Sequence, residues 1–394
     1  MTTKPTALIV GAGISGLSAA WWLDKAGWRS ILIERSAAIR DGGYVMSLAG
    51  PSRKTIKEMG LQDTLEQMSI KFEENIILDK GGHELIRFKY EDVHGSGPEG
   101  SLAICRDDLA RIISQHLPEG ADIRFSETLG DVSEEGDKIK ATLKTSGESI
   151  EADLLIGADG IRSDVRSRFW RDVDCLEHLG YSYAVYDVEG TATDTHTSTC
   201  VTYNSPGHAD ILYELRDKRL AGLHLWRDDA VHLNDRADRM KTVREATEGA
   251  GIKAVSDVVN QAEKAGCTPV VDSLTMVNLP QWSKGRVLLL GDAAHCLTLI
   301  SGQGAGMALV SAEILGKELQ ATKDVAHALA NHGRRLRPAI TRLQDRSRSM
   351  AAVYVTKNWL GYFVRNLILK ILPYRWIVAW LADSAKAELK LLNE

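Results

Sequence analysis

Three glycine-rich segments of this chain each bring a polar group to the end of an apolar run, an arrangement that suits ligand binding. The first is Gly11-Ala12-Gly13-Ile14-Ser15-Gly16, the second is Asp159-Gly160, and the third is Gly291-Asp292. Parallel sheets bind ligands beyond the carboxyl ends of their strands. If the three apolar runs are neighbouring parallel strands, one elongated ligand can contact all three segments.

The first segment has the GxGxxG spacing of a dinucleotide-binding turn. Gly11 permits a tight turn, Gly13 lets a pyrophosphate approach the backbone, and Gly16 lets the following helix pack closely on its strand. A second apolar run then ends at Glu34, whose carboxylate is placed to accept hydrogen bonds from a ribose diol. Strand, helix, strand and acid follow the order of a βαβ unit, so the sequence predicts dinucleotide binding.

The third segment continues into another glycine-rich stretch, Gly302-Gln303-Gly304, ahead of a helical pattern that begins at Ala305. The first backbone N–H groups of a helix lack partners within the helix, and its N-terminus carries partial positive charge. The stretch therefore predicts a seat for an electron-rich group. The alternative is an ordinary strand, turn and helix in which the glycines serve close packing.

The elements that must position these segments follow two kinds of pattern. The segment 153–156, apolar after Asp153, and the uninterrupted apolar run at 287–290 predict strands buried on both faces of a parallel sheet. From 181 to 226 the period changes to two, which predicts consecutive antiparallel strands. Shorter strands predict a small antiparallel meander at 123–125, 139–143 and 149–150.

The predicted fold class is therefore α/β, with a Rossmann-like parallel sheet, an inserted antiparallel-sheet substrate domain and a C-terminal helical segment. The predicted nucleotide-binding domain is discontinuous, the substrate domain is inserted into it, and helices close the chain. The ranges are 1–70, 101–180 and 270–330 for the nucleotide-binding domain, 71–100 and 181–269 for the substrate domain, and 331–394 for the helices.

Aromatic and imidazole side chains on the inserted sheet are candidates for contact with a substrate. The candidates are Tyr186, Tyr203, Tyr213, His224 and Trp226. For any one of them, packing or surface exposure is the simpler explanation.

Composition narrows the class of partner. The net charge of −5 and the lack of a long basic run argue against a nucleic-acid ligand and favour a small molecule. The five cysteines are scattered singly with no CxxC pair, which fits a reducing compartment and predicts no metal site. The N-terminus reaches its first strand too early for a secretory signal, so we expect a cytoplasmic protein.

The last part of the chain is unusually apolar. The segment from Trp359 to Ala382 is interrupted by Arg365, Lys370, Pro373 and Arg375, so it falls short of a membrane span. Two short amphipathic helices are predicted, and these could make weak contact with a membrane or an apolar partner. Packing against the rest of the protein is the alternative.

Four sets of residues, taken together and in order, carry a resemblance to one family. They are the GxGxxG motif ending in Glu34-Arg35, Arg106 at a helix start, Asp159-Gly160 with Ser163 and Arg166, and Gly291-Asp292-Ala293-Ala294-His295 continuing to Gly302-Gln303-Gly304. Over roughly residues 5–350 the sequence resembles the class A flavoprotein monooxygenases of the para-hydroxybenzoate hydroxylase fold, which include aromatic-ring hydroxylases and tetracycline-modifying monooxygenases.

The resemblance implies FAD as the cofactor and assigns residues to it. The pyrophosphate, ribose, adenine and flavin contacts that it implies are Gly11, Ala12, Gly13, Ile14, Ser15, Gly16, Glu34, Arg35, Arg106, Leu129, Asp159, Asp292, Gly302, Gln303, Gly304 and Ala305. In such proteins the helix N-terminus at 302–305 stabilises negative charge on the reduced ring.

The implied reaction starts with reduction of FAD by NADPH or NADH. Addition of O₂ gives a flavin C4a-hydroperoxide, which inserts one oxygen atom into an electron-rich, apolar aromatic or polycyclic substrate. A single GxGxxG after a strand suits transient binding of the reductant. A flavin oxidase or dehydrogenase without oxygen insertion, and a non-catalytic FAD-binding subunit, are the alternatives.

The catalytic candidates are Tyr213, His224 and the loop around Leu299. Relatives usually carry proline between the histidine and the GQG stretch, whereas residues 296–301 here contain none. Proline would stiffen this loop. We therefore expect a more mobile or differently shaped loop beside the flavin.

Overall fold

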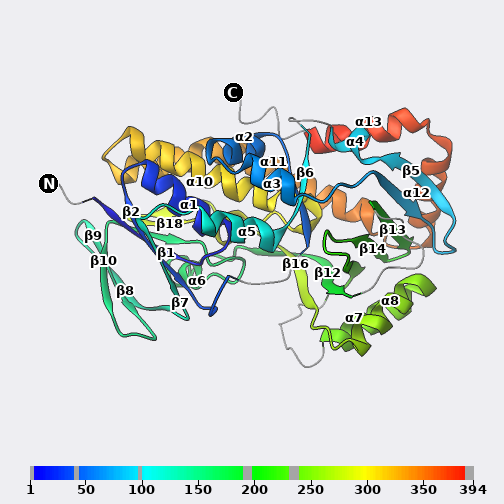
Figure 1. Ribbon diagram of the computed structural model, residues 1–394, viewed down its shortest axis with the longest axis horizontal. Coiled ribbons are helices and arrows are strands. Elements are labelled where there is room, and N and C mark those ends of the chain that lie inside the picture. Colours follow the sequence, from blue (N-terminus) through cyan, green and yellow to red (C-terminus); the bar gives the residue numbers. More distant parts are fainter. Residues whose placement is uncertain (1–3, 40–43, 96–99, 190–197, 230–238, 387–394) are drawn as a thin grey trace.

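The structure is a computed structural model that describes residues 4–39, 44–95, 100–189, 198–229 and 239–386. Two large sheets lie side by side along its long axis; the helix α10 (Gly304–Ala321) packs against α1 beside the first, and the long helix α11 (Val325–Tyr354) extends to the second (Figure 1). The α/β class, the parallel sheet, the antiparallel insertion and the C-terminal helices that the sequence predicted are all confirmed.

The first half of the chain contains β1 (Thr6–Val10), α1 (Ile14–Lys25), β2 (Arg29–Glu34), β3 (Val45–Leu48), α2 (Pro51–Glu58), α3 (Gln62–Met68), β4 (Glu74–Leu78), β5 (Glu84–Lys89), α4 (Tyr90–His94), β6 (Leu102–Cys105), α5 (Arg106–Gln115), β7 (Ala121–Phe125), β8 (Leu129–Glu135), β9 (Lys138–Leu143), β10 (Ser149–Ala152), β11 (Leu154–Gly157) and α6 (Asp164–Phe169).

The second half contains β12 (Leu176–Val188), β13 (Thr199–Ser205), β14 (His208–Glu214), β15 (Leu220–Arg227), α7 (Arg239–Ala250), α8 (Lys253–Lys264), β16 (Val270–Val277), β17 (Ser283–Lys284), β18 (Val287–Leu289), α9 (Asp292–His295), the 3₁₀ turn η2 (Leu299–Ser301), α10, α11, α12 (Trp359–Ile371) and α13 (Tyr374–Lys386).

The six-stranded sheet has the order β17-β18-β11-β1-β2-β7, and all its neighbours except β17 and β18 are parallel. Val10 lies opposite Ile33 and Gly157, and Gly157 lies opposite Leu289. The carboxyl ends of β1, β2, β11 and β18 are therefore level. This register brings the three glycine-rich segments to one edge of the sheet, as the sequence predicted.

One strand of the predicted meander belongs elsewhere. The strand β7 pairs in parallel with β2, where Ile33 lies opposite Arg124, and only β8, β9 and β10 form the antiparallel meander. The prediction that 123–125 joins the meander is wrong because a five-residue strand does not reveal its partner. A parallel partner is distant in the chain, and its pairing depends on the tertiary fold.

The seven-stranded sheet has the order β16-β12-β15-β14-β13-β4-β5. Only β13 and β4 pair in parallel, so the hairpin of β4 and β5 joins the sheet through β13. The predicted strands exist, but β12 pairs with β15 and β16 and not with β13, which follows it in the chain. The helices α7 and α8 pack on one face of this sheet through Val243, Val255 and Val259.

The predicted ranges divide this sheet, because they assign part of β12 and all of β16 to the nucleotide-binding domain. The strand β12 begins at Leu176, inside the range 101–180, and β16 lies inside the range 270–330. Both strands pair with each other in the seven-stranded sheet. The chain therefore enters this sheet before residue 181 and leaves it after residue 277.

The C-terminal helices finish the molecule at the far end of the seven-stranded sheet. Pro338 lies inside α11, which continues to Tyr354. The helix α13 packs against α4 and the neighbouring β5 through Ile377 and Val378 (Figure 1). Within the described part of the chain, every helix is too short or too polar to cross a bilayer.

Candidate functional site

Two cavities open at the carboxyl edge of the six-stranded sheet. The first, of about 370 Å³, is lined by the GxGxxG turn and Glu34, and we call it the nucleotide cavity. The second, of about 400 Å³, extends under the seven-stranded sheet, and we call it the inner cavity. Five residues line both cavities, and we call this shared wall the neck: Gly13, Ile14, Arg106, Ala158 and Gly160.

The glycines of the first turn differ in what a side chain would meet. A Cβ on Gly16 would overlap the carbonyl oxygen of Gly11, and one on Gly11 would lie 2.5 Å from the oxygen of Ala158. A Cβ on Gly13 would meet nothing within 4 Å. Gly13 is also the residue before α1, where backbone N–H groups lack helical partners. The space in front of it therefore suits the pyrophosphate of a dinucleotide.

Glu34 lies at the end of β2 and lines the nucleotide cavity. Its carboxylate accepts hydrogen bonds from the backbone N–H of Ala12 at 3.0 Å and of Ser36 at 2.9 Å. These bonds fix the acid beside the glycine turn. Arg35 and Leu129 line the same cavity, and the carbonyl of Leu129 accepts a bond from Arg168 at 3.2 Å.

Asp159 lines the nucleotide cavity, but its carboxylate is engaged within the protein. It accepts hydrogen bonds from the Ser163 hydroxyl and from the backbone N–H of Asp164 at 2.7 Å. Burial raises the pKa of this carboxyl above its usual range, and the bonds from the start of α6 oppose that rise. The buried Arg166 then donates to the carbonyls of Ile161 and Ala293, which ties the second segment to the third.

Arg106 and Asp292 bring opposite charges to the walls of the inner cavity. Arg106 is the first residue of α5, and Asp292 is the first residue of α9. The Asp292 side chain is accessible from the cavity, and the surrounding protein nevertheless desolvates its carboxyl. Desolvation by this burial raises the pKa of its carboxyl, and the Arg106 guanidinium partly offsets the rise.

The loop between Cys296 and Ala305 forms one end of the inner cavity. Thr298 has φ +67° and ψ 159°, a conformation found almost only for glycine, and it precedes the turn η2. Gly302, Gly304 and Ala305 line the cavity, so the first turn of α10 faces it. The Gln303 side chain is buried outside this lining, and its Oε1 atom has no hydrogen-bond partner among the described residues.

Of the five predicted substrate contacts, only Tyr213 lines the inner cavity. Its ring meets Phe72 edge-on at 5.9 Å, and its hydroxyl accepts a bond from the backbone N–H of Val45 at 3.2 Å. Burial raises the pKa of Tyr213, which keeps the phenol neutral. This environment does not suit a catalytic base.

The other four, Tyr186, Tyr203, His224 and Trp226, lie on the opposite face of the sheet. Side chains alternate along a strand, so Leu223 and Leu225 of β15 face the cavity while His224 and Trp226 face away. Tyr186, Tyr203 and Trp226 pack against the helices α7 and α8. The expectation that these residues contact a substrate in the cavity does not match their positions.

His224 is instead the centre of a buried polar group. Its Nδ1 atom lies 2.7 Å from the Asp210 carboxylate, and its Nε2 atom lies 2.9 Å from the Tyr186 hydroxyl. His224 and Asp210 are each 1% exposed. The three side chains are linked through His224 beneath the helices α7 and α8, and the second carboxylate oxygen of Asp210, Oδ2, has no hydrogen-bond partner among the described residues.

Several cavity residues were missed by the sequence analysis. Tyr44, Tyr183, Tyr90, His94 and Asp272 all line the inner cavity. Burial raises the pKa of Tyr44 to about 12 and lowers the pKa of His94 to about 4, so both are neutral near pH 7. Tyr183 could have been found from its strand, because alternation separates it from Tyr186.

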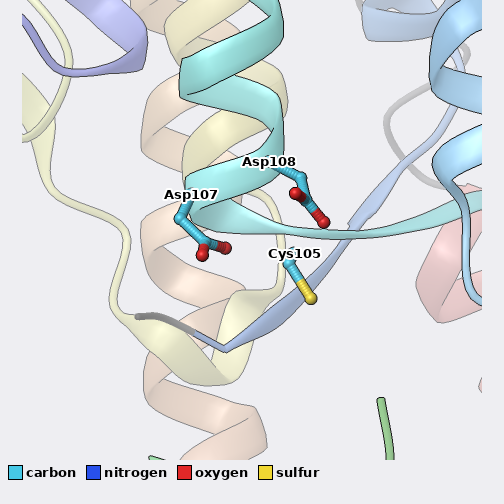
Figure 2. A group of neighbouring side chains, drawn as sticks. All are labelled: Cys105, Asp107 and Asp108. Atoms are coloured by element: carbon cyan, nitrogen blue, oxygen red, sulfur yellow. The ribbon is translucent and has the colours of Figure 1, made fainter. Parts of the chain in front are cut away.

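A possible metal site appears at the start of α5, where Cys105, Asp107 and Asp108 lie within ligand distance of one another (Figure 2). Asp108 forms an ion pair with Arg111. Burial and the nearby Asp107 raise the pKa of Cys105 to about 11, which disfavours the thiolate that binds metals. Asp107 and Asp108 lie in the first turn of α5, where a carboxylate interacts favourably with the partial positive charge of the helix N-terminus.

Comparisons with known proteins agree with this geometry. A family model described as FAD binding domain matches residues 4–330. A flavin-dependent monooxygenase from an unknown prokaryotic organism is 27% identical over 91% of this chain and 91% of that protein.

Two crystal structures share the fold across nearly the whole chain. The tetracycline destructase Tet(51) has a TM-score of 0.81 and 22% identity, covering 99% of each chain. HpxO of Klebsiella pneumoniae, complexed with FAD and uric acid, has a TM-score of 0.82 and 21% identity, covering 97% of this chain and 96% of its own. With a family model that matches most of its length, this chain belongs to the FAD binding domain family, which confirms the resemblance to class A FAD-dependent monooxygenases.

Proposed function

We propose that this protein is an FAD-dependent monooxygenase that uses NADPH or NADH and O₂ to insert one oxygen atom into an electron-rich apolar small molecule. One observation carries the proposal. The nucleotide cavity and the inner cavity are neighbours, because the neck residues, Gly13 and Arg106 among them, line both. A dinucleotide seated on the first cavity would present its far end to a substrate in the second.

The residues of the nucleotide cavity fit the adenosine and pyrophosphate of FAD. Glu34 offers carboxylate oxygens to a ribose, the backbone at Gly13 offers N–H groups to the pyrophosphate, and Leu129 and Arg35 line the adenine side. Arg106 at the neck supplies positive charge near the phosphates. Asp159 supports this wall through α6.

The inner cavity provides the surroundings for the flavin ring. FAD supplies the electron transfer and the oxygen chemistry when it is bound. The first turn of α10, with Gly302, Gly304 and Ala305 on the cavity wall, would stabilise negative charge on the ring. Arg106 and Asp292 place a cation and a carboxyl on the lining of this cavity.

The remaining wall favours an apolar, aromatic or polycyclic substrate. Leu223, Leu225 and Ile211 face the cavity from the sheet, and phenol rings from Tyr44 and Tyr183 add polar edges. Such a wall also excludes water from the reacting atoms. Uric acid, which is bound in one structural neighbour, is a bicyclic molecule, and the name of the other neighbour refers to tetracyclines, which contain four fused rings.

The proposal also includes a nicotinamide reductant that binds transiently and a cytoplasmic location. The chain has one GxGxxG motif after a strand, which supports transient binding of the nicotinamide reductant. Its scattered cysteines support a cytoplasmic location.

Anaerobic reduction followed by exposure to O₂ tests the function. The FAD-loaded protein is mixed with NADPH or NADH in the absence of O₂, with and without a panel of phenols, polyketides and indoles. We expect loss of flavin absorbance, its return with O₂, and a product heavier by one oxygen atom in mass spectrometry. With ¹⁸O₂ the label should enter the product.

Two variants provide the controls. Arg106→Ala should weaken FAD binding by about tenfold or more, because it removes a charge at the neck. Arg335→Ala removes an exposed arginine that pairs with Glu318 and should leave FAD binding unchanged. Oxidised product that contains no ¹⁸O would identify an oxidase or dehydrogenase. No reduction by either nicotinamide would contradict the proposal.

A further inference from the structure

The helix α12 is amphipathic, and its apolar side faces solvent. Its exposed apolar residues recur at intervals of three and four, which places them on one face of the helix. They are Leu360, Phe363, Val364, Leu367, Ile368 and Ile371, and each is at least 44% exposed. We call this set the outer face.

Hydrogen bonds on the opposite side hold α12 in this orientation. The Tyr362 hydroxyl donates to the carbonyl of Asn204 at 3.2 Å and accepts a bond from the backbone N–H of Lys80 at 2.9 Å. The Arg365 guanidinium donates to the Asn204 side chain at 3.0 Å and to the carbonyl of Tyr354 at 3.2 Å. The polar side of the helix is therefore bound to the protein, while the apolar side remains uncovered.

The apolar surface continues onto the neighbouring residues. Trp359, Leu372, Tyr374 and Trp376 are also exposed, by 39–63%. Elsewhere in the described part of the chain, the exposed large hydrophobic residues are isolated: Phe125, Leu176 and Val270. Soluble proteins seldom expose such a contiguous apolar surface without a partner for it.

Exposed basic residues around the outer face favour an anionic lipid surface as its partner. Lys357, Lys370 and Arg375 are exposed beside it, and the Lys80 ammonium lies 5.3 Å from the centre of the Trp359 ring. The sequence from 357 to 382 contains no acidic residue, although the whole chain carries a net charge of −5. Basic residues around an apolar helix face are complementary to anionic lipid headgroups.

Two acids of α4 offset part of this charge, but the exposed basic residues Lys80, Lys357, Lys370 and Arg375 outnumber them. The Asp92 carboxylate of α4 accepts a hydrogen bond from the Tyr374 hydroxyl at 2.6 Å, and Glu91 lies 3.9 Å from Lys89. Indole and phenol rings at Trp359, Trp376 and Tyr374 border the outer face, and such rings favour the boundary between headgroups and acyl chains.

We propose that the outer face of α12, with Trp359 and Trp376 at its ends, docks this protein onto the surface of an anionic lipid bilayer. The helix lies in the plane of the membrane and does not cross it. This inference concerns binding alone and does not depend on the oxygenase reaction.

Vesicle co-sedimentation of the full-length, FAD-loaded protein tests the proposal. The probes are vesicles of phosphatidylcholine with phosphatidylserine and vesicles of phosphatidylcholine alone. We expect tighter binding to the vesicles that contain phosphatidylserine. The double variant Leu360→Gln, Ile371→Gln should bind both kinds at least about tenfold more weakly, because two apolar anchors are lost.

A matched control replaces two exposed apolar residues elsewhere. Leu176→Gln with Val270→Gln should leave vesicle binding unchanged, since both lie outside the outer face. Lys370→Gln and Arg375→Gln should each weaken binding to phosphatidylserine vesicles by about fivefold and leave binding to phosphatidylcholine unchanged.

Three outcomes would overturn the proposal. The first is wild-type protein that stays in the supernatant with both kinds of vesicle. The second is a Leu360→Gln, Ile371→Gln variant that binds as the wild type does. The third is a concentration-dependent dimer, abolished by the same double variant and formed without vesicle binding, which would assign the face to a second copy. FAD content and flavin reduction, measured on each variant, separate these outcomes from failure of the proposed reaction.

Discussion

Arg162 and Asp272 form a two-pronged ion pair that joins the two large sheets. The guanidinium Nη1 and Nη2 atoms lie 2.9 Å and 2.7 Å from the two carboxylate oxygens. Arg162 lies in the loop after β11 and lines the nucleotide cavity, whereas Asp272 belongs to β16 and lines the inner cavity. One side-chain pair thus spans the boundary between the two cavities.

The contribution of this pair to stability should be small. The Arg162 side chain is 43% exposed, so solvent screens the attraction. A double-mutant cycle with Arg162→Ala and Asp272→Ala, measured by urea unfolding, should give a coupling free energy below about 1 kcal/mol. The pair Arg335 and Glu318, of similar exposure, provides a control within α10 and α11. A coupling near about 3 kcal/mol would show that the pair behaves as a buried one.

Two glycines of the same turn should respond differently to alanine. Gly13→Ala should change the free energy of unfolding of the FAD-free protein by less than about 1 kcal/mol, because its Cβ would meet open space. It should weaken FAD binding by about tenfold or more, about 1.4 kcal/mol, by blocking close approach of the pyrophosphate.

Gly16→Ala should instead prevent stable folding, because its Cβ would overlap the Gly11 carbonyl oxygen. Circular dichroism of the FAD-free proteins and quenching of FAD fluorescence separate the two effects. Normal FAD affinity in Gly13→Ala would exclude the pyrophosphate from this position.

Thr298 occupies a backbone conformation that costs a β-branched residue about 1–3 kcal/mol. Thr298→Gly should remove this strain and raise the free energy of unfolding by about 1 kcal/mol, after the greater chain entropy of glycine is counted. Thr298→Ala keeps the strain and serves as the control. Thermal or urea unfolding of the FAD-free proteins gives the comparison; equal stability of Thr298→Gly and Thr298→Ala would show that the conformation is not strained.

Buried histidines should make the fold sensitive to acid. Burial lowers the pKa of His94 and of His332 to about 4, and that of His295 to about 3, from an ordinary value of 6.5. Below pH 6.5 the unfolded chain binds protons that the folded chain does not, so stability falls as the pH falls towards 4. The loss is at most about 3 kcal/mol for each histidine.

Urea unfolding at a series of pH values measures this loss. His332→Gln should reduce the steepness of the fall between pH 6.5 and pH 4, whatever its effect on stability at neutral pH. His327→Gln changes an exposed histidine at the start of α11 and should leave the slope unchanged. An unaltered slope in His332→Gln would contradict its assignment as a buried neutral group.

The cofactor side of the site follows from local sequence, and the substrate side does not. Gly11, Asp159 and Asp292 each end a continuous apolar run, and parallel strands must align their carboxyl ends, so their convergence is predictable. His224 shows why the sequence does not predict which side chains line the substrate side. Alternation puts it on the face opposite Leu223, but only the packing of α7 and α8 decides which face is open to the cavity.

The sequence also does not reveal which strand a short strand pairs with. The apolar and polar residues of β7 suit either a meander or a parallel edge, and the pairing of Ile31 with Asp122 depends on a crossover through more than one helix. Tyr44 and His94 lie in connecting segments without a periodic pattern, so no sequence signal places them on the cavity wall.

The neck at Gly13, Arg106 and Gly160 has a thermodynamic consequence. Because both cavities share these residues, a bound dinucleotide would form part of the boundary of the substrate chamber. Substrate and cofactor affinities are then linked. By whatever factor FAD changes the affinity for substrate, substrate must change the affinity for FAD by the same factor.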